Sequence, residues 1–157
     1  MLLHANMATT LALRAFDGFA SAMEQTEPPM AAYRAMGLAT QAHAATYPLA
    51  AMLPPVNRFY LESDVREDEE LQHKLMEADP EKSNVGVMHA DNASDQRGGF
   101  SVYVPEYYQG ETLPLVVALH GGSGHGRQFL WSWLRAVRSD PCILIAPTSS
   151  DRTWSCL

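Results

Sequence analysis

Hydrophobic residues recur at helical spacing in the first third of the chain. We predict a first helix that begins at Thr9 or Thr10 and ends near Glu24, because apolar residues recur every four positions along it, at Leu11, Ala15, Phe19 and Met23. A second helix is predicted from Met30 to about Thr46, between segments whose prolines interrupt helical hydrogen bonding. The chain is therefore expected to open with an α-helical segment.

A third helix is predicted from about Asn57 to Ala78, with a partial apolar face formed by Leu61, Val65, Leu71, Leu75 and Met76. Residues 62–81 contain nine acidic and two basic side chains. A charge run of this kind is usually a solvated helix face or a linker. It lacks the Asp-x-Asp-x-Asp-Gly pattern of a calcium loop, so the carboxylates do not indicate a metal site.

The hydrophobic period changes after Pro80. Residues 84–89 are predicted as a short strand, and Phe100 to Val104 alternate in the way expected of a second strand. The glycines at the end of residues 96–99 indicate a turn before that strand. We therefore expect an antiparallel pair.

A continuous apolar run at residues 113–119 is predicted as a strand buried on both faces. A glycine-rich loop at 121–126 follows, and then a helix from about Gly126 to Arg138. The apolar face expected for this helix comprises Phe129, Leu130, Trp133, Leu134 and Val137. Residues 142–146 are predicted as another buried strand, which completes a βαβ unit with parallel strands.

The predicted fold class is therefore α/β, with a strand hairpin and one βαβ unit preceded by a helical segment. The change in composition places a helical part at residues 1–84 and a sheet-containing part at residues 85–157.

Composition narrows the function classes. The net charge of −7 disfavours a nucleic-acid partner, which needs clustered Lys and Arg. We see neither a secretory signal nor an apolar run long enough to span a membrane, and we expect a cytoplasmic protein. Two cysteines, Cys142 and Cys156, build neither a disulfide framework nor a zinc site. No cofactor or metal is predicted, and the oligomeric state stays open.

The glycine-rich loop is the candidate site, because ligands bind at the carboxyl ends of parallel strands. Phosphate binding is disfavoured, since Arg127-Gln128 occupies the place of the Lys-Ser/Thr pair that a phosphate loop requires. The glycines at 122, 124 and 126 also lack dinucleotide-loop spacing. Stabilisation of an oxyanion during acyl transfer is the favoured alternative. A tight turn without a ligand remains open as well.

The order of motifs resembles the α/β-hydrolase superfamily over residues 85–157. His120-Gly121-Gly122 after an apolar strand looks like its oxyanion motif, and Ala146-Pro147 after the next strand is typical of the family. Residues 100–105 are similar to those of its carboxylesterase, phospholipase and polyester-depolymerase-like members. The resemblance implies that the N–H of Gly122 or Ser123 is an oxyanion donor, and that His120 and Gly121 support the loop.

A nucleophile is not evident in the sequence. Gly-x-Ser-x-Gly does not occur, and Ser123 departs from that pattern because His125 stands where the second glycine belongs. We interpret His125 as a loop or helix-cap residue. In the family the Ser, Asp and His follow the oxyanion loop, so we expect them beyond Leu157.

We therefore interpret the chain as the N-terminal half of a serine hydrolase that acts on small carboxylic esters. The alternative is a truncated, non-catalytic interaction module.

Overall fold

The computed structural model describes residues 1–22, 24 and 28–155. These residues form a mixed α/β structure with five α-helices, one short 3-10 helix and a four-stranded sheet. The chain separates into two compact units, residues 1–56 and 57–157, and each is described by itself. The change in composition predicted a boundary between the helical part and the sheet-containing part after residue 84. In the structure, residues 57–84 belong to the same unit as the sheet. Cys156 lies outside the described residues.

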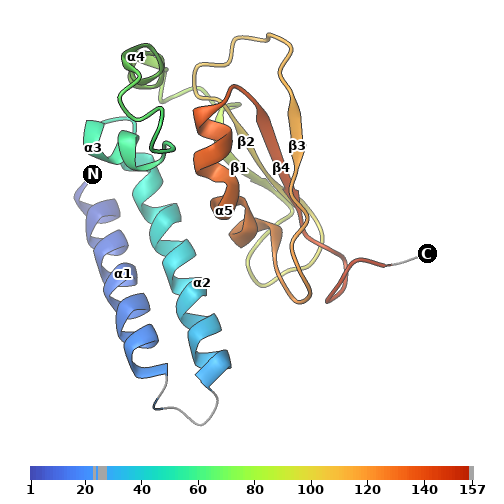
Figure 1. The fold of residues 1–157 in the computed structure, drawn as a ribbon. Helices are drawn as coiled ribbons and strands as arrows, with labels where there is room; N and C mark the ends of the chain where they lie inside the picture. Colours follow the sequence, from blue (N-terminus) through green and yellow to red (C-terminus); the bar gives the residue numbers. More distant parts are fainter. Residues whose placement is uncertain (23, 25–27, 156–157) are drawn as a thin grey trace. The chain divides into compact units, whose positions relative to one another are not determined.

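The first unit is an antiparallel helical hairpin of α1 (Leu2–Ala22) and α2 (Pro28–Thr46), followed by the short helix η1 (Tyr47–Leu49) (Figure 1). Small residues line the contact between the two long helices: a Cβ added at Gly18 would lie 3.1 Å from that of Ala35. Large apolar side chains point outward instead, with Phe16 70% exposed. No described helix is long and apolar enough to cross a membrane.

Both helices begin earlier than predicted. The Thr9 hydroxyl donates to the carbonyl of Ala5 at 2.9 Å, so Thr9 lies inside α1 rather than capping it. The second helix starts at Pro28 instead of Met30, and proline suits a first helical turn because the N–H it lacks has no partner there.

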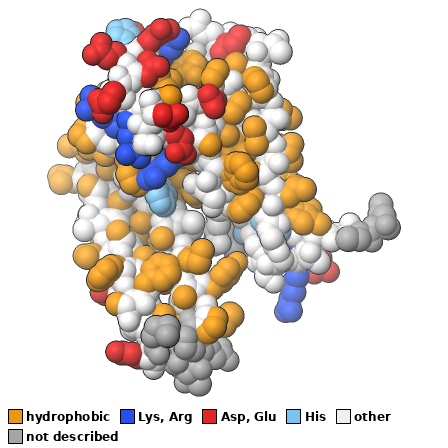
Figure 2. Space-filling view, in the orientation of Figure 1, with side chains coloured by type: hydrophobic (Ala, Val, Ile, Leu, Met, Phe, Trp, Pro, Cys, Tyr) orange, Lys and Arg blue, Asp and Glu red, His pale blue; other side chains and the backbone are white. Residues whose placement is uncertain are grey.

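The single helix predicted from Asn57 to Ala78 is wrong. The chain forms α3 (Pro54–Phe59) and α4 (Glu69–Glu77), which are separated by turns. Asp68 starts α4 by accepting a hydrogen bond from the Leu71 N–H at 3.0 Å. All nine acidic side chains of residues 62–81 are exposed, which confirms a solvated surface, and Figure 2 shows charged side chains gathered over this part of the second unit.

The sheet contains β1 (Gly86–Ala90), β2 (Phe100–Val104), β3 (Leu115–Val117) and β4 (Ile143–Pro147), in the order β1-β2-β4-β3. The pairs β1–β2 and β2–β4 are antiparallel, and β3–β4 is parallel. Helix α5 (Gly126–Ser139) connects β3 to β4. The predicted hairpin and βαβ unit are both confirmed.

One face of the sheet packs against α5 (Figure 1). Tyr103, Leu144 and Ala146 share this face and have no exposed surface, and Leu130 and Leu134 of the helix are equally buried. The predicted burial of residues 113–119 on both faces is wrong, because Leu115, Val117 and Leu119 are 62%, 55% and 56% exposed. These side chains are exposed because β3 is an edge strand among the described residues and because α5 covers the other face of the sheet.

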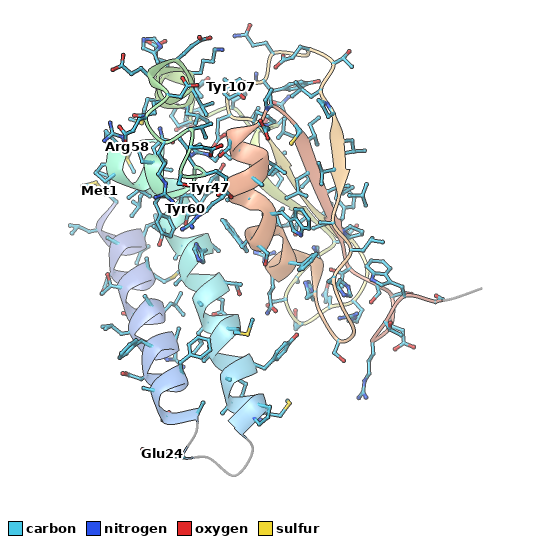
Figure 3. All side chains as sticks on the ribbon, viewed as in Figure 1. Met1, Glu24, Tyr47, Arg58, Tyr60 and Tyr107 are labelled. Atoms are coloured by element: carbon cyan, nitrogen blue, oxygen red, sulfur yellow. The ribbon has the colours of Figure 1, made fainter. Side chains whose placement is uncertain are left out.

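Trp133 also departs from its predicted place on the buried face of α5, since it is 42% exposed. The apolar stripe of this helix is narrower than the sequence indicates, because Leu130, Leu134 and Val137 fill the contact with the sheet. Trp131 contacts Tyr60, a side chain labelled in Figure 3, with ring centroids 6.4 Å apart.

A buried arginine joins the start of the second unit to its core. Arg138 is 2% exposed and donates to Glu106 at 2.8 Å and to the side-chain oxygen of Asn57 at 2.6 Å. Tyr103 donates to the other carboxylate oxygen of Glu106 at 2.7 Å. A buried cation of this kind is tolerated only when it is paired and fully hydrogen-bonded.

We predict that Arg138→Ala lowers the free energy of unfolding of the second unit by about 3 kcal/mol or more, because it removes a buried cation that bonds to Glu106 and Asn57. Urea titration followed by tryptophan fluorescence measures this unit, since all three tryptophans lie in residues 57–157. Arg152→Ala, at an exposed position, is the control and should change the free energy by less than about 0.5 kcal/mol. Equal changes in the free energy of unfolding for the two substitutions would contradict a stabilising role for the buried Arg138.

Candidate functional site

The loop between β3 and α5, residues 118–125, contains every predicted site residue. It leaves the carboxyl end of β3 at the same end of the sheet as the segment that follows β4 (Figure 1). Gly121, Gly122 and Ser123 are exposed, while His120 and His125 are buried. The four predicted residues therefore lie on one loop, and three of them are exposed.

His120 holds the loop against the segment after β4, which we call the strap (residues 149–154). Its Nε2 accepts a hydrogen bond from the Ser149 N–H at 3.1 Å, and its Nδ1 lies 2.7 Å from the carbonyl oxygen of Gly121. Its own carbonyl accepts from Trp154 Nε1 at 2.8 Å, and the two rings pack with centroids 4.8 Å apart. One neutral tautomer, protonated on Nδ1, satisfies both ring contacts. These are contacts of a loop-supporting residue, and its role in catalysis stays a prediction.

Residues 121–124 form a β-turn. The Gly124 N–H donates to the carbonyl of Gly121 at 3.0 Å, and Ser123 has a φ of 60°. A positive φ at the third position, with none at Gly122, matches a type II turn. Serine adopts this conformation at a cost that glycine avoids, so the turn is held by its surroundings.

The structure distinguishes the two predicted oxyanion donors. The Ser123 N–H donates to the carbonyl of Arg152 in the strap at 2.6 Å. The Gly122 N–H has no hydrogen-bond partner among the described residues. A Cβ added at Gly121 or Gly122 would meet nothing within 4 Å. Gly122 therefore presents a free donor next to open space, while the donor of Ser123 is occupied.

Gly126 has a different reason to be glycine. A Cβ added there would lie 2.2 Å from the carbonyl oxygen of Ala146 and 2.6 Å from that of Pro147. The first turn of α5 thus packs directly on the end of β4. The Gly126 N–H donates to Thr148 Oγ1 at 2.9 Å, which fixes this contact.

His125 caps α5, as predicted. Its Nδ1 accepts from the Arg127 N–H at 3.1 Å, and its Nε2 donates to the carbonyl of Gln96 at 2.9 Å. It is therefore turned toward the segment between β1 and β2. Among the described residues, the Ser123 hydroxyl makes no hydrogen bond, so Ser123 and His125 do not form a nucleophile–base pair.

A serine–histidine contact does occur elsewhere. His89 Nδ1 lies 2.7 Å from Ser101 Oγ, which also accepts from Asn92 Nδ2 at 2.8 Å. Ser101 has no exposed surface, so a substrate carbonyl has no access to its hydroxyl. Asn92 Oδ1 in turn accepts from Thr148 at 2.7 Å. This polar chain ties the β1–β2 segment to the start of α5.

Sequence reasoning missed Asn92, Arg97 and Thr148. They are single polar residues in separate segments, and only the fold brings them together. Within the part of the chain that the structure describes, no three metal-ligating side chains come together. Comparison with known protein families, curated proteins and solved structures found no match.

The polar chain has a consequence for stability. Partial burial of the His89 ring, and then the positive charge of Arg127 and the nearby His125, lower its pKa from 6.5 to about 4. Between pH 6.5 and pH 4 the unfolded chain therefore binds more protons at His89 than the folded chain does. The contribution of His89 to stability is lost as the pH falls through this window.

We predict that the free energy of unfolding of the second unit falls between pH 6.5 and pH 4, and that His89→Gln makes this fall shallower. Glutamine can still accept the Ser101 hydrogen bond but does not titrate. Urea titrations at several pH values measure the slope. An identical slope in both proteins would show that His89 does not contribute.

Proposed function

We propose that residues 120–123 form part of the oxyanion hole of a serine hydrolase that acts on small carboxylic esters. Gly122 supplies the donor, Gly121 leaves space beside it, and His120 holds the loop to the strap. The proposal narrows the pair of predicted donors to one, because the N–H of Ser123 is occupied by Arg152.

The observation that carries this proposal is the free N–H of Gly122 beside open space. Gly122 has neither a positive φ nor a close neighbour that would require glycine. Its neighbours in the turn are held by hydrogen bonds to Gly121 and Arg152. A donor that is fixed in advance and aimed at the developing oxyanion lowers the barrier by roughly 3–4 kcal/mol in acyl transfer.

The topology supports the same function. The loop joins β3 to the following helix, and in the α/β-hydrolases one oxyanion donor comes from the loop at this place in the fold. The second donor in that family belongs to the residue after the nucleophile. Because Gly-x-Ser-x-Gly is absent from the sequence and Ser101 is buried, the proposal requires a nucleophile from outside residues 1–157.

In this scheme the nucleophile would attack the ester carbonyl, and the carbonyl oxygen would gain charge beside the Gly122 N–H. His120 would support the loop, since its Nδ1 and Nε2 both contact groups of the loop and strap. No metal or organic cofactor is needed for this reaction, because the backbone donors and the acid–base residues carry it.

A second candidate is a non-catalytic interaction module. It is favoured by the helical hairpin, where alanines fill the seam and large apolar side chains such as Leu2, Leu13 and Phe16 are exposed. Exposed apolar surface of this kind often marks an association site. This candidate leaves the free donor at Gly122 without a role, so the hydrolase is preferred.

The substitution Gly122→Pro tests the donor in the hydrolase that contains this chain. Proline is favoured at the second position of a type II turn, so it should keep the turn and remove only the N–H. We predict that kcat for a chromogenic short-chain ester falls by roughly 100-fold or more.

Gly122→Ala is the matched control, because it keeps the N–H and adds a Cβ that meets nothing within 4 Å. It should lose much less activity and should leave the free energy of unfolding unchanged or slightly higher. Wild-type activity in Gly122→Pro would overturn the proposal, and so would equal losses in the two variants.

A further inference from the structure

Arg97 lies on the segment between β1 and β2, far from the loop in sequence, yet its guanidinium reaches the loop. Nη1 donates to the carbonyl oxygen of Gly124 at 2.6 Å. Nη2 donates to the hydroxyl of Ser149 and to the carbonyl oxygen of Asp151, both in the strap. One side chain therefore connects the end of the turn to the strap.

The backbone around Arg97 is itself hydrogen-bonded to the start of α5 and to the segment that follows β4. The Gln96 carbonyl accepts from His125, which caps α5. The Gly98 N–H donates to the Ser149 carbonyl at 3.3 Å, and the Gly99 carbonyl accepts from the Thr148 N–H at 3.0 Å. Arg97 thus extends from an anchored segment, so only its side chain has to be ordered when it bonds to the loop and the strap.

Arginine suits this position for a chemical reason. Its planar guanidinium keeps its charge at all relevant pH values and presents several N–H groups in a rigid fork. The acceptors on Gly124, Ser149 and Asp151 are neutral oxygens, so the hydrogen bonds are strengthened by the charge of Arg97 alone. A lysine ammonium has a single nitrogen and does not span acceptors on both segments in the same way.

We propose that Arg97 is a positioning residue for the oxyanion loop. By joining Gly124 to the strap, it keeps the Arg152 carbonyl on the N–H of Ser123 and so leaves Gly122 as the outward donor. The catalytic part of this inference rests on the proposed function, while the positioning part concerns the chain alone. Arg97 is exposed, and if it had no positioning role its removal would leave the turn unchanged.

Amide hydrogen exchange in the 157-residue chain, resolved by NMR, tests the positioning directly. In Arg97→Ala we expect exchange at Ser123 and Gly124 to become roughly tenfold faster or more, the effect of losing about one hydrogen bond. Amides of β2 and β4 should change by less than about twofold, because the core packing is not altered. In Arg97→Lys, the exchange rates of Ser123 and Gly124 should lie between those of the native chain and those of Arg97→Ala.

Arg152→Ala is the matched control. It removes an exposed arginine from the strap but keeps the backbone carbonyl that accepts from Ser123. Its exchange at Ser123 and Gly124 should match that of the native chain. If Arg97→Ala leaves these amides unchanged, or if all amides of the second unit speed up together, the positioning role is wrong.

Ester hydrolysis by the hydrolase that contains this chain then separates the two proposals. If Arg97 positions an oxyanion donor, Arg97→Ala should lower kcat with little change in KM, and Arg97→Lys should recover part of the loss. Faster exchange at Ser123 without any ester hydrolysis by the native enzyme would reject the proposed function and keep the positioning role. Normal kcat with faster exchange would reject the catalytic part.

Discussion

The direct packing of the first turn of α5 on the end of β4 determines where every candidate residue lies. It requires glycine at position 126, since a Cβ there would lie 2.2 Å from the Ala146 carbonyl oxygen. With the start of the helix fixed, the loop from β3 must turn sharply over residues 121–124 to reach it. The strap that leaves β4 then lies beside that turn. Its Ser149 N–H donates to His120, and its Arg152 carbonyl accepts from Ser123 in the turn.

Around this contact, polar groups from separate segments satisfy one another. Thr148 accepts from Gly126, Asn92 accepts from Thr148, and His125 caps the helix. Of the buried side-chain nitrogen and oxygen atoms that the structure describes, none lacks a partner. The free donor at Gly122 lies on the exposed turn, where a ligand can replace water. Bonded side chains that support a turn with an open donor are the arrangement that electrostatic preorganisation needs.

Much of the architecture was predictable from local pattern. The alternation at residues 100–104 predicted β2 with the observed bounds, and the apolar runs around the glycine loop predicted the parallel βαβ unit. Burial was harder to predict, because the exposure of Leu115 and Val117 depends on which elements cover the sheet. The helix predicted from Asn57 is interrupted by turns after Phe59, and Asp68 then starts α4 as its N-cap.

In the candidate site, too, local features were predictable and features that depend on tertiary contacts were not. A glycine-rich loop after an apolar strand was predictable from the sequence. The roles expected for His120, Gly121 and Gly122 came from the resemblance to the α/β-hydrolases and stay predictions. The choice between Gly122 and Ser123 could not be predicted, because it depends on the Arg152 carbonyl, which the fold alone brings to the turn. Arg97 carries no sequence signal, since an isolated arginine in a turn is ordinary.

The measurement that tests the account most directly is the exchange rate of the two candidate donors in the native chain. Residue-resolved amide exchange should show Ser123 protected by its bond to Arg152 and Gly122 exchanging at nearly the rate of an unstructured peptide. The reverse order, or equal protection of the two amides, would contradict a loop that holds Ser123 and presents Gly122.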